Sequence, residues 1–165
     1  MKIVFLLVFV CLFVMSCTKK DSDVNNSQNY FKVNAKKYVV DKAYYTIDSF
    51  SKYTEIAIVS SGITYDANLL EFKGTGNAIT FEIEDITSVL KSGTYSTPDG
   101  FWSAVGLNYN SLTQFVNLYE IKETVPGKLT ITKNNSNYNI QFEFTLESGE
   151  IVTGQYIGTV KKERF

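Results

Sequence analysis

Histidine is absent from this chain of 165 residues, and both of its cysteines, Cys11 and Cys17, lie at the extreme N-terminus. The lack of histidine excludes Ser-His-Asp and Cys-His catalysis and every metal site that needs an imidazole ligand. Beyond residue 17 the lack of cysteine also excludes disulfides, thiolate nucleophiles and cysteine metal sites. Proline occurs only twice, which excludes collagen-like and proline-rich disordered classes.

The chain also lacks an excess of either charge, since 16 basic and 17 acidic residues give a formal net charge of −1. Nucleic-acid binding needs a clustered basic surface, so we expect no nucleic-acid partner. What the chain does have is apolar and aromatic residues, 44% and 15% of the total, enough for the core of one domain. Tyr, Thr, Ile, Val and Phe dominate, and these residue types suit a pleated sheet.

The first residues read MKIVFLLVFVCLFVMSC, with a single positive charge at Lys2 followed by an unbroken apolar run from Ile3 to Met15. A run of this length is too short for a stable transmembrane helix and is typical of a signal peptide. We therefore predict that residues 1–16 form a signal peptide. Cys17 would otherwise be an unpaired thiol in an oxidising compartment, which favours its modification.

The run ends in Val14-Met15-Ser16-Cys17, which resembles the lipobox of bacterial lipoproteins. The resemblance implies a thioether-linked diacylglycerol on Cys17, cleavage before this residue, and usually a further acyl chain such as palmitate on the new amine. Two or three acyl chains anchor a protein stably, whereas one does so only marginally. We expect the membrane to be a partner through this anchor. The alternative is an ordinary secretory signal followed by a cysteine by chance.

The stretch TKKDSDVNNSQN after the cysteine is polar and has no periodicity. It cannot bury apolar area, so we predict that residues 17–29 form a lipidated, disordered tether. No Asp follows Cys17 directly, and the resemblance to lipoproteins with enterobacterial-type sorting then implies the outer membrane. The segment 19–23 resembles the surface-export signals of Bacteroidetes lipoproteins. The expected location is the cell envelope, at the outer membrane, with display on the cell surface as one option.

Residues 30–165 are predicted to form a single all-β domain, because short β-branched and aromatic runs alternate with turn signals. The expected architecture is an antiparallel β-meander that forms either a barrel, lipocalin-like as one option, or a two-sheet sandwich. A single helical turn is expected near 85–90, with Ile86, Val89 and Leu90 facing inward. The predicted strands cover 30–33, 37–41, 43–50, 53–60, 67–73, 78–85, 93–97, 101–109, 115–121, 128–133, 138–146 and 151–160.

The C-terminal segment predicts a hairpin in which alternate residues from Tyr138 to Leu146 line one face. A three-residue loop, 147–149, with Gly149 at positive φ would set the register of the hairpin. A shift by one residue would bury Thr153 and Gln155, so one register is strongly favoured. The expected pairs are Phe144 with Val152, Phe142 with Gly154, Ile140 with Tyr156 and Tyr138 with Gly158.

The stretch from Gly127 to Val160, GKLTITKNNSNYNIQFEFTLESGEIVTGQYIGTV, resembles the terminal β-meander of small Bacteroidetes lipoproteins of unknown function. The resemblance implies a β-sandwich or a lipocalin-like barrel. The Gly-X-Trp of lipocalins is absent near the first strand, because the single tryptophan, Trp102, lies in the middle of the chain. The resemblance covers about the last fifth of the chain.

Glu82 and Glu84 are the strongest candidates for chemistry, since paired carboxylates can act as acid and base in glycoside hydrolysis. However, Ile79, Phe81 and Ile83 alternate with them, which predicts that the glutamates point to solvent. Asp99 follows Pro98 and suits a turn. Asp21 and Asp23 supply too few oxygens for calcium. We therefore predict no catalytic residue, no metal and no cofactor.

The middle of the chain is rich in aromatic residues, namely Phe101, Trp102, Tyr109, Phe115 and Tyr119. Aromatic residues mostly serve cores, so strands buried on both sides are the favoured interpretation. The alternative is a platform that stacks a sugar ring or encloses a small apolar ligand. If a ligand site exists, we expect it at Trp102 and Tyr109.

Three functional hypotheses remain open. The leading one is a non-enzymatic binding or interaction module on a lipid anchor, whose partner is a glycan, a small apolar ligand or an envelope protein. The second is a carrier or inhibitor with a barrel that encloses an apolar ligand. The third is a carboxylate-based glycosidase. Fold alone does not choose among them, because function is determined by the site.

Overall fold

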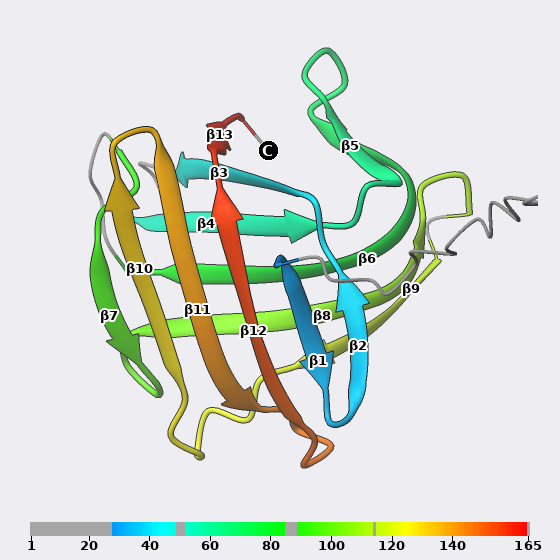
Figure 1. Cartoon of the computed structure of the whole chain (residues 1–165). Coiled ribbons are helices and arrows are strands. Elements are labelled where there is room, and N and C mark those ends of the chain that lie inside the picture. The colour runs from blue at the N-terminus through cyan, green and yellow to red at the C-terminus, as the bar shows by residue number, and fades with distance from the viewer. Residues whose placement is uncertain (1–27, 49–51, 85–88, 114, 165) are drawn as a thin grey trace, which may run out of the picture.

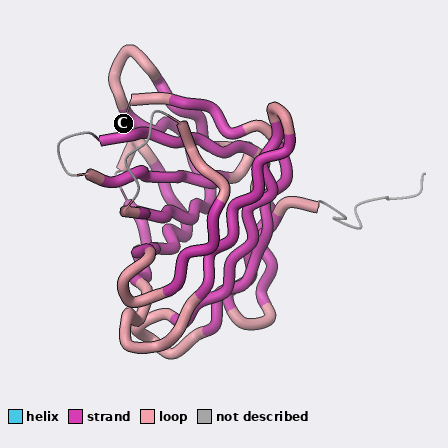
Figure 2. Tube along the Cα trace, turned by 90° about the vertical axis from the view of Figure 1, so that its left-hand side faces the viewer, coloured by secondary structure: helices cyan, strands magenta, loops and turns pink. Residues whose placement is uncertain are grey.

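The computed structural model describes residues 28–48, 52–84, 89–113 and 115–164. These residues form thirteen β-strands, and none of them lies in a helix (Figure 2). No helix long and apolar enough to cross a membrane is found among the residues described. The predicted all-β class is confirmed.

The strands form two sheets packed face to face (Figure 1). In Figure 1, β10, β11 and β12 run steeply across β4, β6 and β8, as in sandwiches with crossed strand directions. The six-stranded sheet has the order β2 (Lys36–Val39), β1 (Tyr30–Val33), β12 (Ile151–Gly158), β11 (Asn137–Thr145), β10 (Lys128–Asn134) and β7 (Gly93–Ser96). The seven-stranded sheet has the order β13 (Val160–Lys162), β3 (Lys42–Asp48), β4 (Tyr53–Val59), β6 (Glu71–Ile83), β8 (Phe101–Asn110) and β9 (Phe115–Glu120), and β5 (Ile63–Asp66) pairs with β6.

The two-sheet alternative is therefore the observed one, and the sheets do not close into a barrel. The order of neighbours departs from a simple meander, because β1 pairs with β12 and β7 pairs with β10. The strand predicted over 151–160 divides near Thr159, and β13 crosses to the other sheet, where it runs parallel to β3. Strands that change sheet in this way form the corners of crossed sandwiches. Val160 buries its side chain after the crossing.

The C-terminal hairpin has the predicted register. All four expected pairs are present: Phe144 with Val152, Phe142 with Gly154, Ile140 with Tyr156 and Tyr138 with Gly158. Gly149 has φ of +87°, which favours glycine in the loop. At Gly154 a Cβ atom would lie 2.5 Å from Cζ of Phe142 and 2.6 Å from the carbonyl oxygen of Tyr30, so no larger residue fits there.

The core lies between the two sheets and is filled by side chains of the described residues. Its centre is a group of phenylalanines, in which the ring of Phe81 lies 5.0 Å from that of Phe142 and 6.2 Å from that of Phe144. Phe81 comes from the seven-stranded sheet and the other two come from the six-stranded sheet. Contacts of this kind join the two layers.

Two local predictions are corrected. The strand expected over 67–73 is instead a turn up to residue 70, followed by the start of β6. β6 then continues to Ile83 through Gly74 and Gly76, where the predicted strands 67–73 and 78–85 were separated by a break. Those glycines lie beside an irregularity in the pairing between Gly76 and Ala78, where a strand can bend without ending. Of the predicted helical turn, 85–88 lie outside the described residues. Leu90 is buried as expected, but Val89 is 45% exposed rather than inward.

Candidate functional site

The outer face of the seven-stranded sheet carries the residues that alternate with the core. In β6 the side chains of Ile79, Phe81 and Ile83 are buried between the sheets, as predicted. Glu82 therefore points outward, where it is half-buried, and Glu84 beyond the end of the strand is exposed. The core side of the strand thus determines which residues reach the surface.

At this end of the sheet the outer face is hollowed into a cleft of about 600 Å³, which we call the Trp102 cleft. Its residues come from the start of β4, the end of β6, the start of β8 and two neighbouring loops. The lining consists of Tyr53, Glu82, Glu84, Pro98, Asp99, Gly100, Phe101, Trp102 and Glu123. A cleft of this size accommodates a small molecule.

The strand register brings the central residues together. Glu82 of β6 lies directly opposite Glu55 of β4 on one side and opposite Trp102 of β8 on the other. Residues directly opposite one another have Cβ atoms about 4.5–5.5 Å apart, so the three side chains form one row across the sheet. Trp102 is half-buried and leaves part of its ring available in the cleft.

Thr97 connects the two loops that form the cleft wall. Its side-chain hydroxyl donates a hydrogen bond to the carbonyl oxygen of Val125, at 2.9 Å, and accepts one from the N–H of Gly127, at 2.6 Å. These contacts tie the loop that carries Asp99 to the loop that carries Glu123. A buried hydroxyl that both donates and accepts a hydrogen bond fixes the relative positions of its two partners.

The cleft is strongly acidic. Four of its lining residues, Glu82, Glu84, Asp99 and Glu123, carry carboxylates, and none of the lining residues is a lysine or arginine. Within the part of the chain that the structure describes, none of these four carboxylates forms a hydrogen bond or an ion pair that would offset its charge. Burial, and after it the neighbouring carboxylate of Glu82, raises the pKa of Glu55 above its ordinary value.

These carboxylates are spread over the walls of the cleft. No group of three or more Asp, Glu, His or Cys residues within the described ranges is arranged to hold a metal ion. The four carboxylates of the cleft therefore do not form a metal site of this kind. Phe101, although at the edge of the cleft, is 4% exposed and belongs mainly to the core.

The two predicted ligand residues lie at different places. Trp102 is in the cleft, whereas Tyr109 lies seven residues further along β8, which corresponds to about 23 Å in an extended strand. Tyr109 packs under the β5–β6 hairpin, where its hydroxyl donates a hydrogen bond to the carbonyl oxygen of Phe72 at 2.5 Å. The two residues therefore do not form one site.

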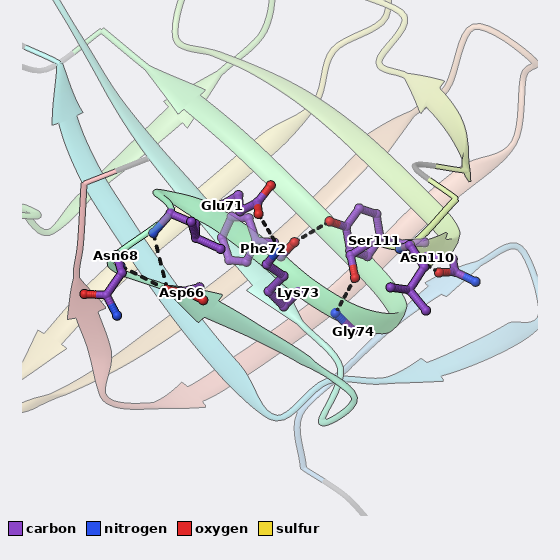
Figure 3. A network of polar contacts seen from close by, with 11 residues as sticks. Asp66, Asn68, Glu71, Phe72, Lys73, Gly74, Asn110 and Ser111 are labelled. Carbon is purple, nitrogen blue, oxygen red and sulfur yellow. Dashed lines mark hydrogen bonds and ion pairs between the residues drawn. The ribbon is translucent and has the colours of Figure 1, made fainter.

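The hairpin around Tyr109 is held by its own polar contacts (Figure 3). Ser111 accepts a hydrogen bond from the N–H of Gly74 at 2.9 Å, and Asp66 accepts one from the N–H of Asn68 at 3.0 Å. Lys73 forms an ion pair with Glu71. These contacts stabilise a local structure, so Tyr109 is a packing residue in this arrangement.

The other residues considered from the sequence are distributed as follows. Tyr119 lies on β9 at the edge of the sheet and is 37% exposed. The side chain of Phe115 and the residues Cys17, Asp21 and Asp23 lie outside what the structure describes. Tyr53 and Glu123 were not found from the sequence, because they are distant from Trp102 along the chain and only the strand pairing brings them into the cleft.

Comparison with known protein families, with characterised proteins and with solved structures found no match to this chain. The geometry of the cleft is therefore the basis for any statement about function.

Proposed function

We propose that the mature protein is a lipid-anchored binding module of the cell envelope, without enzymatic activity, which holds its ligand in the Trp102 cleft. The anchor part of the proposal is supported by the lipobox-like sequence ending at Cys17 and by the polar tether after it. A tether of about a dozen residues would hold the domain away from the membrane. The expected location is the outer membrane, with display at the cell surface as the further expectation.

The observation that carries the binding part is the cleft itself. It combines a volume suited to a small molecule, a partly accessible indole ring at Trp102 and several carboxylates without partners among the described residues. An aromatic ring with polar groups around it is the usual composition of a ligand site. A site of this composition can bind a ligand without a reactive side chain, as the proposed non-enzymatic module requires.

The interior of the sandwich favours this module over a carrier. The carrier hypothesis requires an apolar cavity open at one end of a barrel. Here the centre of the space between the sheets is filled by described residues, with Phe31, Phe81 and Ile140 fully buried. A hollow of about 310 Å³ lies where β1 and β2 face β8 and β9, but polar residues such as Lys36, Asn117 and Glu150 line it together with apolar ones. The ligand would therefore bind on the outer face and not inside the fold.

The binding proposal is tested by the fluorescence of Trp102, which is the single tryptophan of the chain. The full chain, in an uncharged polyoxyethylene detergent, is titrated with a panel of choline, spermidine, maltohexaose, cellohexaose and a short-chain fatty acid. We expect at least one compound to change the Trp102 emission in a saturable way. If none changes the emission, the cleft is not a binding site and the proposal is wrong.

The anchor is tested separately by mass spectrometry of the protein extracted from membranes. We expect a diacylglycerol on Cys17 and an N-terminus created by cleavage after Ser16. A chain with an unmodified Cys17, or with the Ser16–Cys17 bond intact, would contradict the lipoprotein assignment. The binding result would stand in either case.

One observation favours a second candidate, a carboxylate-based hydrolase. Glu55 has a pKa raised above its ordinary value and lies directly opposite Glu82, and two neighbouring carboxyl groups in different environments are the arrangement used for glycoside hydrolysis. Glu55 itself does not line the cleft. Hydrolysis of aryl glycosides by the wild-type chain, lost in both Glu55→Gln and Glu82→Gln, would favour the hydrolase over the module.

A further inference from the structure

We infer that the Trp102 cleft binds an organic cation, that is, the ammonium group of a small molecule. This inference rests on the proposed function and names its ligand class. It follows from the charge of the walls, from the position of the aromatic rings and from the way the carboxylates are distributed.

The charge of the walls is the first argument. Four carboxylates line the cleft without a basic residue among them. Two acidic residues elsewhere on the described surface have basic partners, since Glu71 pairs with Lys73 and Glu163 pairs with Lys161. A concave surface of one sign, with low-dielectric walls, concentrates ligands of the opposite sign.

The aromatic rings are the second argument. Trp102 and Tyr53 both line the cleft, Trp102 half-buried and Tyr53 exposed by 36%. A cation over the face of an aromatic ring is attracted by the quadrupole of the ring, and tryptophan is the best of the aromatic residues for this purpose. Carboxylates around an aromatic ring thus offer an ammonium group two favourable contacts at once.

The distribution of the carboxylates separates an organic cation from a metal ion. The acidic residues of the described chain do not converge in threes, as ligands of calcium or another metal would. Instead Glu82 and Glu84 lie at the end of β6, while Asp99 and Glu123 lie in the two loops tied by Thr97. Carboxylates that do not converge on one point suit an organic cation, which can contact them one at a time, better than a single metal ion.

The surroundings of Glu55 give supporting evidence. Burial, and after it the adjacent carboxylate of Glu82, raises the pKa of Glu55, and no basic group is among the causes of this shift. Both carboxylates lie in the row that ends at Trp102. A bound ammonium group beside Glu82 would add a positive charge to this row.

The experiment compares two probes of nearly the same shape, choline and its uncharged isostere 3,3-dimethylbutan-1-ol. The full chain is titrated with each at constant ionic strength in the polyoxyethylene detergent, and the emission of Trp102 is recorded. We expect saturable binding of choline and binding of the isostere that is weaker by about tenfold or more. Spermidine serves as a second cation, and potassium chloride as the control for salt.

Variants locate the cation. Glu82→Gln and Glu84→Gln are each expected to weaken choline binding about threefold, because each removes one negative charge from the wall. Glu143→Gln is the matched control, since Glu143 is exposed on the six-stranded sheet and outside the cleft. Trp102→Ala, studied by calorimetry because it lacks the fluorescent ring, should abolish binding. The glutamate variants keep the experiment informative if Trp102→Ala does not fold.

Three results would overturn the inference. Equal affinity for choline and its isostere would show that charge is not recognised. Unchanged affinity in both glutamate variants would place the cation elsewhere. A response of Trp102 to the neutral oligosaccharides, with none to choline or spermidine, would leave the cleft as a binding site and reject only the cationic ligand. A lack of response to every compound would reject the proposed function as well.

Discussion

The two ends of the outer face of the seven-stranded sheet are built by the same strands, β4, β6 and β8, yet one end is covered and the other is open. At the covered end, Ile63 of the β5–β6 hairpin is buried together with Tyr44 of β3 and with Ala57 and Val59 of β4. Only about 80 Å³ of apolar space remains there, compared with about 600 Å³ in the Trp102 cleft at the open end.

The outward residues explain this difference. Toward the covered end, β4 presents Ala57 and Val59 on its outer face. Two residues before Ala57, nearer the open end, the same face presents Glu55. Apolar residues on a sheet face are stabilised by a cover, while carboxylates favour contact with water or a ligand. The inner face is buried at both ends, with Thr54 and Ser103 among its buried residues at the open end, so it does not determine where a surface site forms. The contrast predicts that substitutions change stability at the covered end and binding at the open end.

The largest expected effect is at the covered end, in Ile63→Ala. Ile63 is 1% exposed, and its removal leaves a cavity beneath the hairpin. We expect a loss of about 3 kcal/mol in the free energy of unfolding, measured by chemical denaturation. Binding to the cleft, measured under conditions where the variant is folded, should be unchanged. A loss of less than about 1 kcal/mol would contradict the view that the hairpin cover is well packed.

Thr97→Val is expected to affect both stability and binding, because Thr97 holds the wall of the open end. The substitution keeps the shape of the side chain but removes its hydroxyl, so the N–H of Gly127 loses its acceptor. A buried unsatisfied donor costs about 1–3 kcal/mol. Denaturation should show this loss, and binding in the cleft should weaken because the two loops lose both side-chain hydrogen bonds and keep only the backbone bond from the N–H of Thr97 to the carbonyl oxygen of Gly127. The conservative variant Thr97→Ser should restore both.

Tyr109→Phe tests whether Tyr109 belongs to the covered end only. The variant keeps the ring and removes the hydrogen bond to the carbonyl oxygen of Phe72. We expect a loss of about 1 kcal/mol in the free energy of unfolding. Titrations followed at Trp102 should match the wild type. Weaker binding in this variant would instead mean that the two ends are coupled.

The fold could be predicted from the sequence wherever one face of a strand is buried. Alternation in the C-terminal hairpin determined both its faces and its register, because a shift by one residue would bury polar side chains. The path of the chain near Gly74 and Gly76 was not predictable in the same way. Glycines there are compatible with a turn or with a bend, and the pairing with β5 and β8 decides between them.

The candidate site could be predicted only in part. Trp102 was identifiable as a single aromatic residue of interest, and the outward direction of Glu82 followed from its apolar neighbours. Their meeting depends on which strands pair, and that Glu82 lies opposite Trp102 is a property of the β6–β8 register. Irregular pairing between Leu107 and Asn110 surrounds Tyr109, which packs under the β5–β6 hairpin. Long-range pairing of this kind leaves no local signal.

A smaller effect is expected in the way the free energy of unfolding depends on pH, through Glu55 at the open end. The raised pKa of Glu55 means that the folded protein binds this proton more tightly than the unfolded chain does. Stability from this group is therefore present below the unfolded pKa and is lost as the pH rises through the folded pKa. Glu55→Gln should remove this part of the pH dependence and raise stability at neutral pH. Denaturation curves at several pH values, with Glu143→Gln as control, measure the difference.

The smallest effect distinguishes a carboxylate with a partner from one without. Glu71→Gln at the covered end removes the ion pair with Lys73, so a slight loss of stability is expected. Glu84→Gln at the open end removes a charge that repels its acidic neighbours, so stability should stay the same or rise slightly. Thermal unfolding of both variants measures the sign of each change. Because exposed charges are screened, both changes should disappear in about 1 M salt. Equal signs at low salt would mean that the carboxylates of the cleft are already compensated, and the cationic ligand would lose its main support.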